Sequence, residues 1–174
     1  VEEGAQPRAH APIRLQEDWN DFFAQGGGES LEPILPDYLK RRRWFGSKGK
    51  EIASVQVREA IPLPNRSETF FVIILVVEFV QGDPEEYLLP VACARGKAAD
   101  LIRANCPHAV ITSVEEAKKD PAGIIYDASA NRHFSRALLE MISQSKEILG
   151  REGKLEGRPT STDKPLPAET NNLK

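Results

Sequence analysis

The chain has few of the residues from which catalytic and metal sites are usually built. Its 174 residues include only three histidines and two cysteines. The histidines, His10, His108 and His133, lie far apart and have no cysteine or carboxylate at metal-ligand spacing, so we assign them to surface or capping positions. Cys93 and Cys106 form no CxxC pair. A disulfide framework is therefore excluded, and the low cysteine content suits a reducing cytosol.

An excess of basic residues and a long hydrophobic run are also missing. Lysine and arginine number 23 against 26 acidic residues, which gives a net charge of −3 and no general attraction to nucleic acid. The longest apolar run, residues 70–77, is far shorter than the ~20 residues needed to span a bilayer. Residues 1–16 lack the apolar segment of a signal peptide. We expect a soluble, cytoplasmic protein with no membrane or nucleic-acid partner.

No catalytic motif is present either. The sequence has no GxSxG, no HxD catalytic loop and no paired carboxylates of the kind used in acid–base catalysis. Residues 46–49, Gly-Ser-Lys-Gly, superficially resemble a phosphate loop. In a true phosphate loop, however, a strand precedes and a helix follows, whereas here we expect the reverse order. We therefore assign no catalytic, cofactor-binding or metal-binding residue and predict that the chain alone is not an enzyme.

The most distinctive segment is residues 41–50, Arg-Arg-Arg-Trp-Phe-Gly-Ser-Lys-Gly-Lys. Its cations could bind phosphate or an acidic partner, but a solvated helix end is the simpler interpretation. We predict that Trp44 and Phe45 are packed, that the charges point outward, and that Trp44→Ala markedly lowers stability. Stacking of the two aromatic rings on a sugar is the alternative. The residues expected to form this structural motif are Arg43, Trp44, Phe45, Gly46 and Lys48.

Hydrophobic periodicity predicts an α+β fold. Residues 30–39 show helical spacing, with Ser30 as N-cap and a restart at Pro36. Three strands should follow as an antiparallel meander at 51–61, 69–80 and 86–95, because their links are too short for parallel crossovers. The middle strand is the most apolar. In the first strand we expect Ala53, Val55, Val57 and Ile61 on one face, and in the third Pro90 predicts an edge position or a bulge.

Later segments supply the cover for this meander. The expected elements are a short helix at 98–104, apolar pieces at 109–114 and 123–126, and a long C-terminal helix at 132–149 that ends at Gly150. The meander should pack against this last helix.

The chain divides into three parts by composition. Residues 1–29 are a leader in which Trp19, Phe22 and Phe23 dock on the body. Residues 30–150 form the domain, and residues 151–174 are a polar linker.

Several segments together resemble the opening of bacterial maltokinases. They are Leu35-Pro36-Asp37-Tyr38-Leu39, Arg42-Arg43-Trp44-Phe45-Gly46-Ser47-Lys48, Tyr87-Leu88-Leu89-Pro90-Val91-Ala92, Ile125-Tyr126-Asp127-Ala128, Phe134-Ser135-Arg136-Ala137-Leu138-Leu139 and Leu155-Glu156-Gly157-Arg158-Pro159-Thr160. The resemblance covers residues 30–160 in family order. Ile13-Arg14-Leu15 with Trp19 and Phe22 is similar to the joint between a trehalose synthase and its fused maltokinase.

This resemblance implies a non-catalytic N-terminal cap with a curved, cystatin-like antiparallel sheet. The family enzyme uses ATP and Mg²⁺ to convert maltose to maltose 1-phosphate in trehalose and α-glucan metabolism. Its nucleotide lysine, catalytic aspartate and metal ligands lie beyond residue 174, so no cofactor is expected in this fragment. The implied partners are kinase lobes and a trehalose synthase domain of the same polypeptide. The alternative is a free-standing module that binds a protein through its sheet or through the cluster at residues 41–43.

Overall fold

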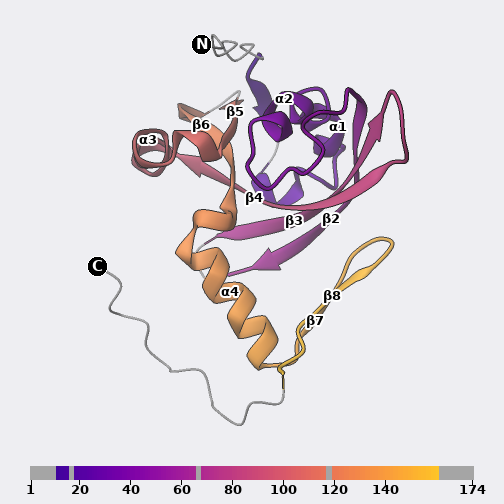
Figure 1. The fold of residues 1–174 in the computed structure, drawn as a ribbon. Helices are drawn as coiled ribbons and strands as arrows, with labels where there is room; N and C mark the ends of the chain where they lie inside the picture. The colour runs from indigo at the N-terminus through magenta and orange to yellow at the C-terminus, as the bar shows by residue number, and fades with distance from the viewer. Residues whose placement is uncertain (1–10, 16–17, 66–67, 117–118, 161–174) are drawn as a thin grey trace.

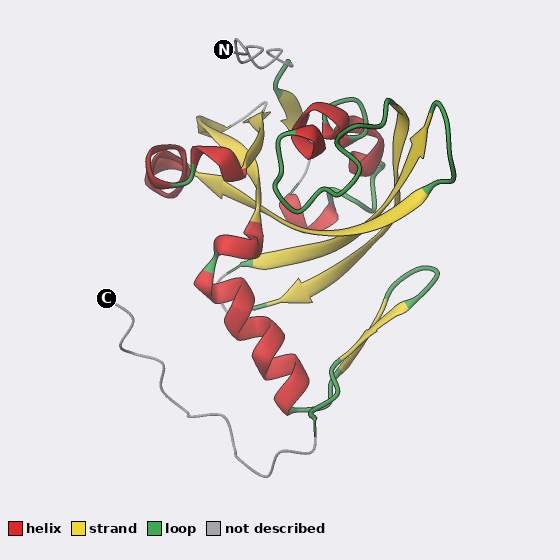
Figure 2. Cartoon of the chain, in the orientation of Figure 1, coloured by secondary structure: helices red, strands yellow, loops and turns green. Residues whose placement is uncertain are grey.

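We describe residues 11–15, 18–65, 68–116 and 119–160 of a computed structural model (Figures 1 and 2). The elements, in chain order, are β1 (Ile13–Leu15), η1 (Trp19–Asp21), α1 (Gly27–Leu31), α2 (Leu35–Lys40), β2 (Ile52–Pro64), β3 (Thr69–Phe79), β4 (Glu85–Arg95), α3 (Gly96–Asn105), η2 (Pro107–Ala109), β5 (Val110–Glu116), β6 (Lys119–Asp127), η3 (Ala128–Ala130), α4 (Arg132–Ser143), β7 (Glu147–Leu149) and β8 (Lys154–Glu156).

The fold is built around a strongly curled sheet of six strands (Figure 1). Its order is β1-β5-β6-β4-β3-β2, and every pair is antiparallel except β1 with β5. The predicted meander forms the β2-β3-β4 part of this sheet, and the α+β class is confirmed. Strand β3 is apolar on both faces and is buried or half-buried over most of its length, as expected for the middle strand of the meander.

The inner, concave face of the sheet carries the larger hydrophobic core. Alternate residues of β3, from Phe71 to Val77, point into it and are almost fully buried. The N-terminal elements η1, α1 and α2 cover this face (Figure 1). Trp19 stacks on Phe22 at 5.3 Å between ring centroids, and its indole Nε1 donates a hydrogen bond to the Thr69 carbonyl. The predicted docking of the leader aromatics is confirmed.

The outer face is covered in part by α4. Phe70 points to this side of β3 and meets Phe134 of α4 edge-on, with centroids 5.6 Å apart. Ala137 and Met141, one helical turn apart, are buried against the same cluster. The predicted packing of the meander against this helix is therefore confirmed.

A β-bulge in β2 overturns one detail of the predicted pattern. The register with β3 shifts between Val57 and Glu59, so the side chains that follow Arg58 change faces. Val55 and Val57 contribute to the inner core, whereas Leu63 belongs to the outer cluster. Ile61, two residues before Leu63 on the same strand face, is therefore opposite to its predicted side. A prediction based on strict alternation of side chains between the two faces fails at a bulge, because the bulged strand contains one extra residue.

Pro90 lies in an interior strand, not in an edge strand. Strand β4 has β3 on one side and β6 on the other. The pairing with β6 begins only at Val91, opposite Asp127, so at Pro90 the β6 side of the strand is not occupied by a ladder partner. Pro90 is paired with Val72 of β3, so the predicted edge position was wrong.

The C-terminal helix is shorter than predicted. Helix α4 ends at Ser143 because Ser145 adopts a left-handed conformation, with φ of 49°. Lys146 N–H then donates to the Met141 carbonyl and closes the helix as in a Schellman motif. The helical stripe that we extended to Leu149 instead becomes β7, which pairs with β8 in a small hairpin. Part of the segment assigned to a linker is thus a strand.

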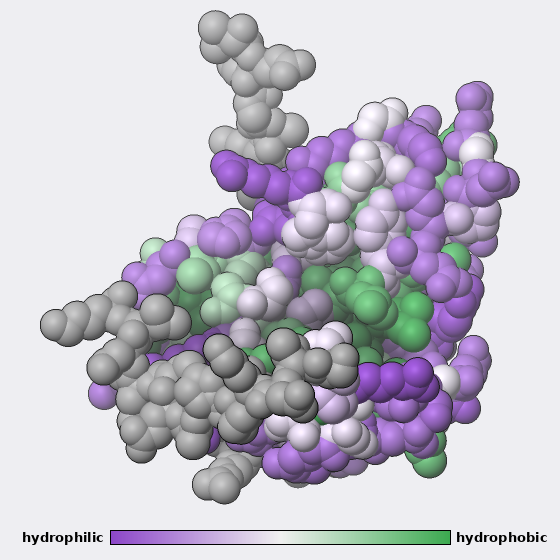
Figure 3. Space-filling view, turned by 60° about the horizontal axis from the view of Figure 1, so that its bottom comes forward, coloured by the Kyte–Doolittle hydropathy of each residue, from purple (hydrophilic) through white to green (hydrophobic). Residues whose placement is uncertain are grey.

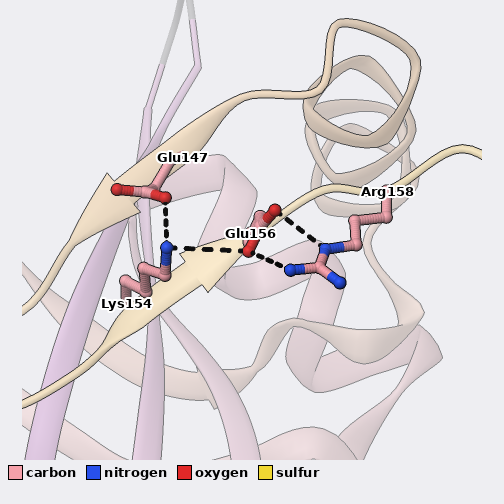
Figure 4. Close-up of polar contacts among 4 residues, drawn as sticks. All are labelled: Glu147, Lys154, Glu156 and Arg158. Carbon is pink, nitrogen blue, oxygen red and sulfur yellow. Dashed lines mark hydrogen bonds and ion pairs between the residues drawn. The ribbon is translucent and has the colours of Figure 1, made fainter.

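The hairpin is fixed at its tip and at its end. The buried Glu59 carboxylate of β2 accepts a hydrogen bond from the Glu152 N–H at 3.0 Å, and a Cβ at Gly157 would collide with the Met141 carbonyl. On the exposed side, Lys154 lies between Glu147 and Glu156 (Figure 4). Arg158 donates two hydrogen bonds to Glu156, and these lower the pKa of that carboxyl.

The N-terminal part of the chain joins the same core as the rest. Strand β1 pairs with β5, and helix α1 starts after Gly26, so Ser30 is inside the helix and the predicted N-cap was wrong. Gly26 can serve there because its φ of 81° is readily reached only by glycine. Helix α2 carries Pro36 in its first turn as predicted. The domain boundaries after residues 29 and 150 stay predictions.

Candidate functional site

Residues 41–50 form two consecutive turns between α2 and β2, which we call the basic corner. Phe45 N–H donates to the Arg42 carbonyl and Lys50 N–H to the Ser47 carbonyl, so each turn is closed by its own backbone. The segment starts at the C-terminal end of α2, where the helix dipole favours cations and where the Tyr38 and Leu39 carbonyls accept hydrogen bonds from the N–H groups of Arg41 and Arg42. It ends at β2, and α2 and β2 therefore fix its position between them.

The two aromatic residues of the corner have different environments. Phe45 is 1% exposed, packs in the inner core and lies 5.0 Å from the Tyr87 ring. Trp44 is 44% exposed, and its ring only borders Tyr87, at 6.1 Å. The prediction of packing is confirmed for Phe45 and wrong for Trp44. In this turn the smaller ring, that of Phe45, lies inside and the indole of Trp44 lies at the surface.

A four-residue network anchors the corner to the start of β4. The Glu85 carboxylate accepts hydrogen bonds from Ser47 Oγ at 2.7 Å, Lys50 Nζ at 2.7 Å and Tyr87 OH at 2.5 Å. These donors, Lys50 above all, lower the pKa of Glu85 to about 2. Burial, and then the neighbouring carboxylate, raise the pKa of Tyr87. Glu85 therefore stays charged and holds both ends of the second turn.

A second set of contacts holds the first turn. Tyr38 of α2 is fully buried and donates its hydroxyl proton to Asp127 Oδ2 at 2.9 Å, and Asp127 is itself only 6% exposed. Burial, followed by the Asp127 charge, raises the pKa of Tyr38. The Arg42 guanidinium lies 4.6 Å from the Tyr38 ring centroid and donates to the His108 carbonyl. One cation of the corner is therefore a structural bridge from α2 to η2.

The remaining cations point outward. Arg43 and Lys48 are exposed, and neither forms an ion pair or hydrogen bond with any part of the chain that the structure describes. Arg41 is also exposed, and its Nε donates to the Asp37 carbonyl. The prediction that the charges point outward holds for these three, whereas Arg42 and Lys50 are committed to internal contacts.

The five motif residues predicted from the sequence thus lie together but do different things. Phe45 is core, Gly46 is exposed, and Arg43, Trp44 and Lys48 face solvent. Sequence analysis missed Glu85 and Tyr87, which hold the corner from 35 residues or more away along the chain. Glu85 and Tyr87 are two residues apart in β4, so their side chains lie on the same face of the strand. This spacing was the one signal available in the sequence.

The described residues also bear on other kinds of site. Among them, no group of three or more histidine, cysteine or carboxylate side chains is arranged to hold a metal ion. Within the same ranges, no helix is both long enough and apolar enough to cross a membrane. The predicted absence of catalytic and cofactor residues stays a prediction.

A comparison with protein families matches residues 38–130 to the maltokinase N-terminal cap domain. This match spans more than half of the chain. The chain belongs to this family. The matched segment contains the basic corner, the whole β2-β3-β4 meander and Asp127. A search of curated proteins finds no match.

Proposed function

We propose that the chain is the non-catalytic N-terminal cap of a maltokinase, which stands alone or is fused to a trehalose synthase. The parent enzyme would use ATP and Mg²⁺ to convert maltose to maltose 1-phosphate, in the cytoplasm, as part of trehalose and glycogen metabolism. The family match over residues 38–130 carries the proposal. The sequence resemblance, which extends from residue 30 to residue 160, supports it, and it also implies the cystatin-like form of the sheet.

The proposed partner is the catalytic part of the same enzyme, and the outer face of the sheet offers a surface for it. Beyond the area covered by α4, paired residues of β3 and β4 present aliphatic side chains to this side. This aliphatic strip consists of Ile74, Val76, Leu88 and Pro90. Leu88 is 63% exposed, and the view from this side has hydrophobic surface gathered in a hollow (Figure 3). Exposed aliphatic patches of this kind are typical of docking surfaces.

An assay of the purified chain tests its non-catalytic role. With ATP, Mg²⁺ and maltose, we expect no formation of ADP or maltose 1-phosphate above a mock-purified control. Phosphoryl transfer needs a set of metal ligands and a positioned base, which the sequence does not supply in any recognisable motif. Maltose-dependent turnover by this chain alone would refute the proposal.

A matched pair of variants tests the docking surface. Leu88 and Leu101 are similarly exposed, at 63% and 62%, but Leu101 is on α3, outside the aliphatic strip. Titration of the catalytic lobes of a maltokinase with the chain should give an affinity that Leu88→Asp lowers at least tenfold. Leu101→Asp should leave it unchanged, and both variants should keep the wild-type melting temperature. Equal effects of the two substitutions would exclude the strip as the contact.

A further inference from the structure

The outward side of the basic corner is a surface that the proposed function does not use. It lies beyond α2, at the top of Figure 1, whereas α4 lies at the bottom. Trp44 is 44% exposed at this corner, and Arg43 and Lys48 flank it in the sequence without partners among the described residues. Tryptophan and arginine are the residues most often found at the centre of protein interfaces. An exposed tryptophan with unpaired cations is therefore a feature that needs an explanation.

The corner is held rigidly although its outer side chains are free. The buried Phe45 side chain anchors the corner in the inner core, and Glu85 accepts hydrogen bonds from Ser47 and Lys50 in the second turn. Arg42 ties the first turn to the His108 carbonyl. A surface that is fixed before binding loses less conformational entropy on association. The internal contacts thus hold the backbone from which Trp44, Arg43 and Lys48 project.

Gly46 leaves the surface beside Trp44 free of a side chain, so that another molecule can approach the backbone there. Its φ lies outside the left-handed region, and a Cβ at this position would meet no atom within 4 Å. Neither the backbone conformation of Gly46 nor its packing against the described residues requires glycine here. Besides strained turns, glycine serves where another chain must come close to the backbone. Because Gly46 directly follows Trp44 and Phe45, the backbone beside the tryptophan carries no side chain that would block a bound segment.

The small number of exposed cations at the corner favours one class of partner. The chain as a whole carries −3, so the corner is a local basic patch on an acidic protein. Nucleic-acid binders present a broad basic surface, whereas this corner offers only a few outward-pointing cations. A short acidic segment needs only two or three cations and can place an apolar side chain on the tryptophan ring. Arginine forms paired hydrogen bonds with carboxylates, which adds direction to this recognition.

We propose that the basic corner binds an acidic segment of another protein or domain. Carboxylates of the segment pair with Arg43 and Lys48, an apolar side chain packs on Trp44, and the segment backbone crosses above Gly46. This surface is distinct from the aliphatic strip, so the proposal does not depend on which domain covers the outer face of the sheet.

Selection from a displayed library of random 12-residue peptides on the immobilised chain tests the proposal without knowledge of the natural partner. We expect enriched peptides to contain several aspartates or glutamates next to a leucine, phenylalanine or tryptophan. Their affinity should fall at least tenfold with Trp44→Ala and with the double variant Arg43→Glu and Lys48→Glu. Gly46→Leu should weaken binding to a similar degree while the melting temperature stays at the wild-type value, since its side chain has open space.

The matched control reverses two other exposed cations that have no partner among the described residues. Lys97→Glu with Arg132→Glu makes the same change in net charge but lies on α3 and α4. This variant should bind the selected peptides as the wild type does.

Three results would each overturn the proposal. In the first, the enriched peptides carry no excess of acidic residues. In the second, they bind the charge-reversed corner as well as they bind the wild type. In the third, a 20-nucleotide single-stranded RNA binds the chain, and the corner variants abolish that binding. The last result would assign the surface to nucleic acid.

Discussion

The two faces of the sheet are covered to different extents, and two adjacent residues of β4 show this most directly. Leu89 points to the inner face and has no exposed surface, whereas Leu88 points to the outer face and is 63% exposed. The same contrast recurs at the basic corner between Phe45 and Trp44. The inner face is completed by the chain itself, through η1, α1 and α2. On the outer face α4 and the hairpin cover only part of the sheet, and among the described residues apolar side chains such as Leu88 stay exposed.

The largest effect is expected where the outer face is covered. Met141, on the buried side of α4, is 3% exposed, and Met141→Asp would place an unpaired charge among apolar side chains. We expect the free energy of unfolding to fall by about 4–5 kcal/mol, the range reached by a buried unpaired charge. Urea denaturation measures it. Leu139→Asp, on the 46% exposed side of the same helix, should cost less than about 0.5 kcal/mol. A similar loss for both would mean that α4 does not dock as described.

The next largest loss of stability is expected at the basic corner, where Phe45 is buried and Trp44 is exposed. Phe45→Ala removes a ring with 1% exposure and should cost about 3–5 kcal/mol. Trp44→Ala should cost less than about 1 kcal/mol, because nearly half of this side chain is already in water. The sequence alone predicted a marked loss for Trp44. Thermal and urea unfolding of the two variants decide the point, and a larger loss for Trp44 would contradict the structure.

Fluorescence adds a check on the alternative use of Trp44. Titration with maltose or trehalose should give no saturable quenching, since the side chains nearest to Trp44 in the sequence are basic and lack the amides and carboxylates of sugar sites. Saturable quenching that disappears in Trp44→Phe would identify a sugar platform instead.

A smaller effect is expected behind the corner. Tyr38→Phe removes the hydroxyl that donates to the buried Asp127 carboxylate. The loss should be about 1–3 kcal/mol, as for a buried acceptor left without one of its donors. Asp127→Asn should cost less, because its amide oxygen can still accept from the Ser129 N–H while its amide N–H donates to the Tyr38 hydroxyl oxygen. Equal stability of Tyr38→Phe and wild type would show that this hydrogen bond contributes nothing.

The smallest effect depends on pH. In the folded state the pKa of Glu85 is about 2, below the value of 4.5 for a free glutamate, so the carboxylate is stabilised by folding. Its contribution is fully present above pH 4.5 and is lost as the pH falls toward 2. Glu85→Gln should therefore be less stable than wild type at neutral pH, and the difference should shrink as the pH falls through this range. A difference that is constant with pH would exclude the charge as its cause.

The sequence predicts much of the meander because its alternation and short links obey simple rules. The failures have local causes. The bulge after Val57 reverses the face of Ile61, and Ser145 enters a conformation that is unusual for serine and ends α4 early. Neither is visible in composition or periodicity.

The candidate site was located by its residue types but not understood from them. Five basic residues in one segment look alike in a sequence, yet Arg42 and Lys50 are bound internally while Arg43 and Lys48 are free of partners among the described residues. That division depends on Glu85 and on the His108 carbonyl, which only the folded chain brings near. Which of two adjacent aromatic rings is buried also depends on the turn geometry.

The uncovered outer face is proposed to contact the catalytic lobes of a maltokinase, and this contact can be measured directly. Hydroxyl-radical footprinting measures it, by comparing side-chain oxidation in the chain alone and with those lobes added. Leu88 and Leu101 start from nearly equal exposure, 63% and 62%. We predict that addition of the lobes lowers oxidation of Leu88 severalfold and leaves Leu101 unchanged. Equal oxidation of Leu88 with and without the lobes, under conditions in which the complex forms, would contradict the account.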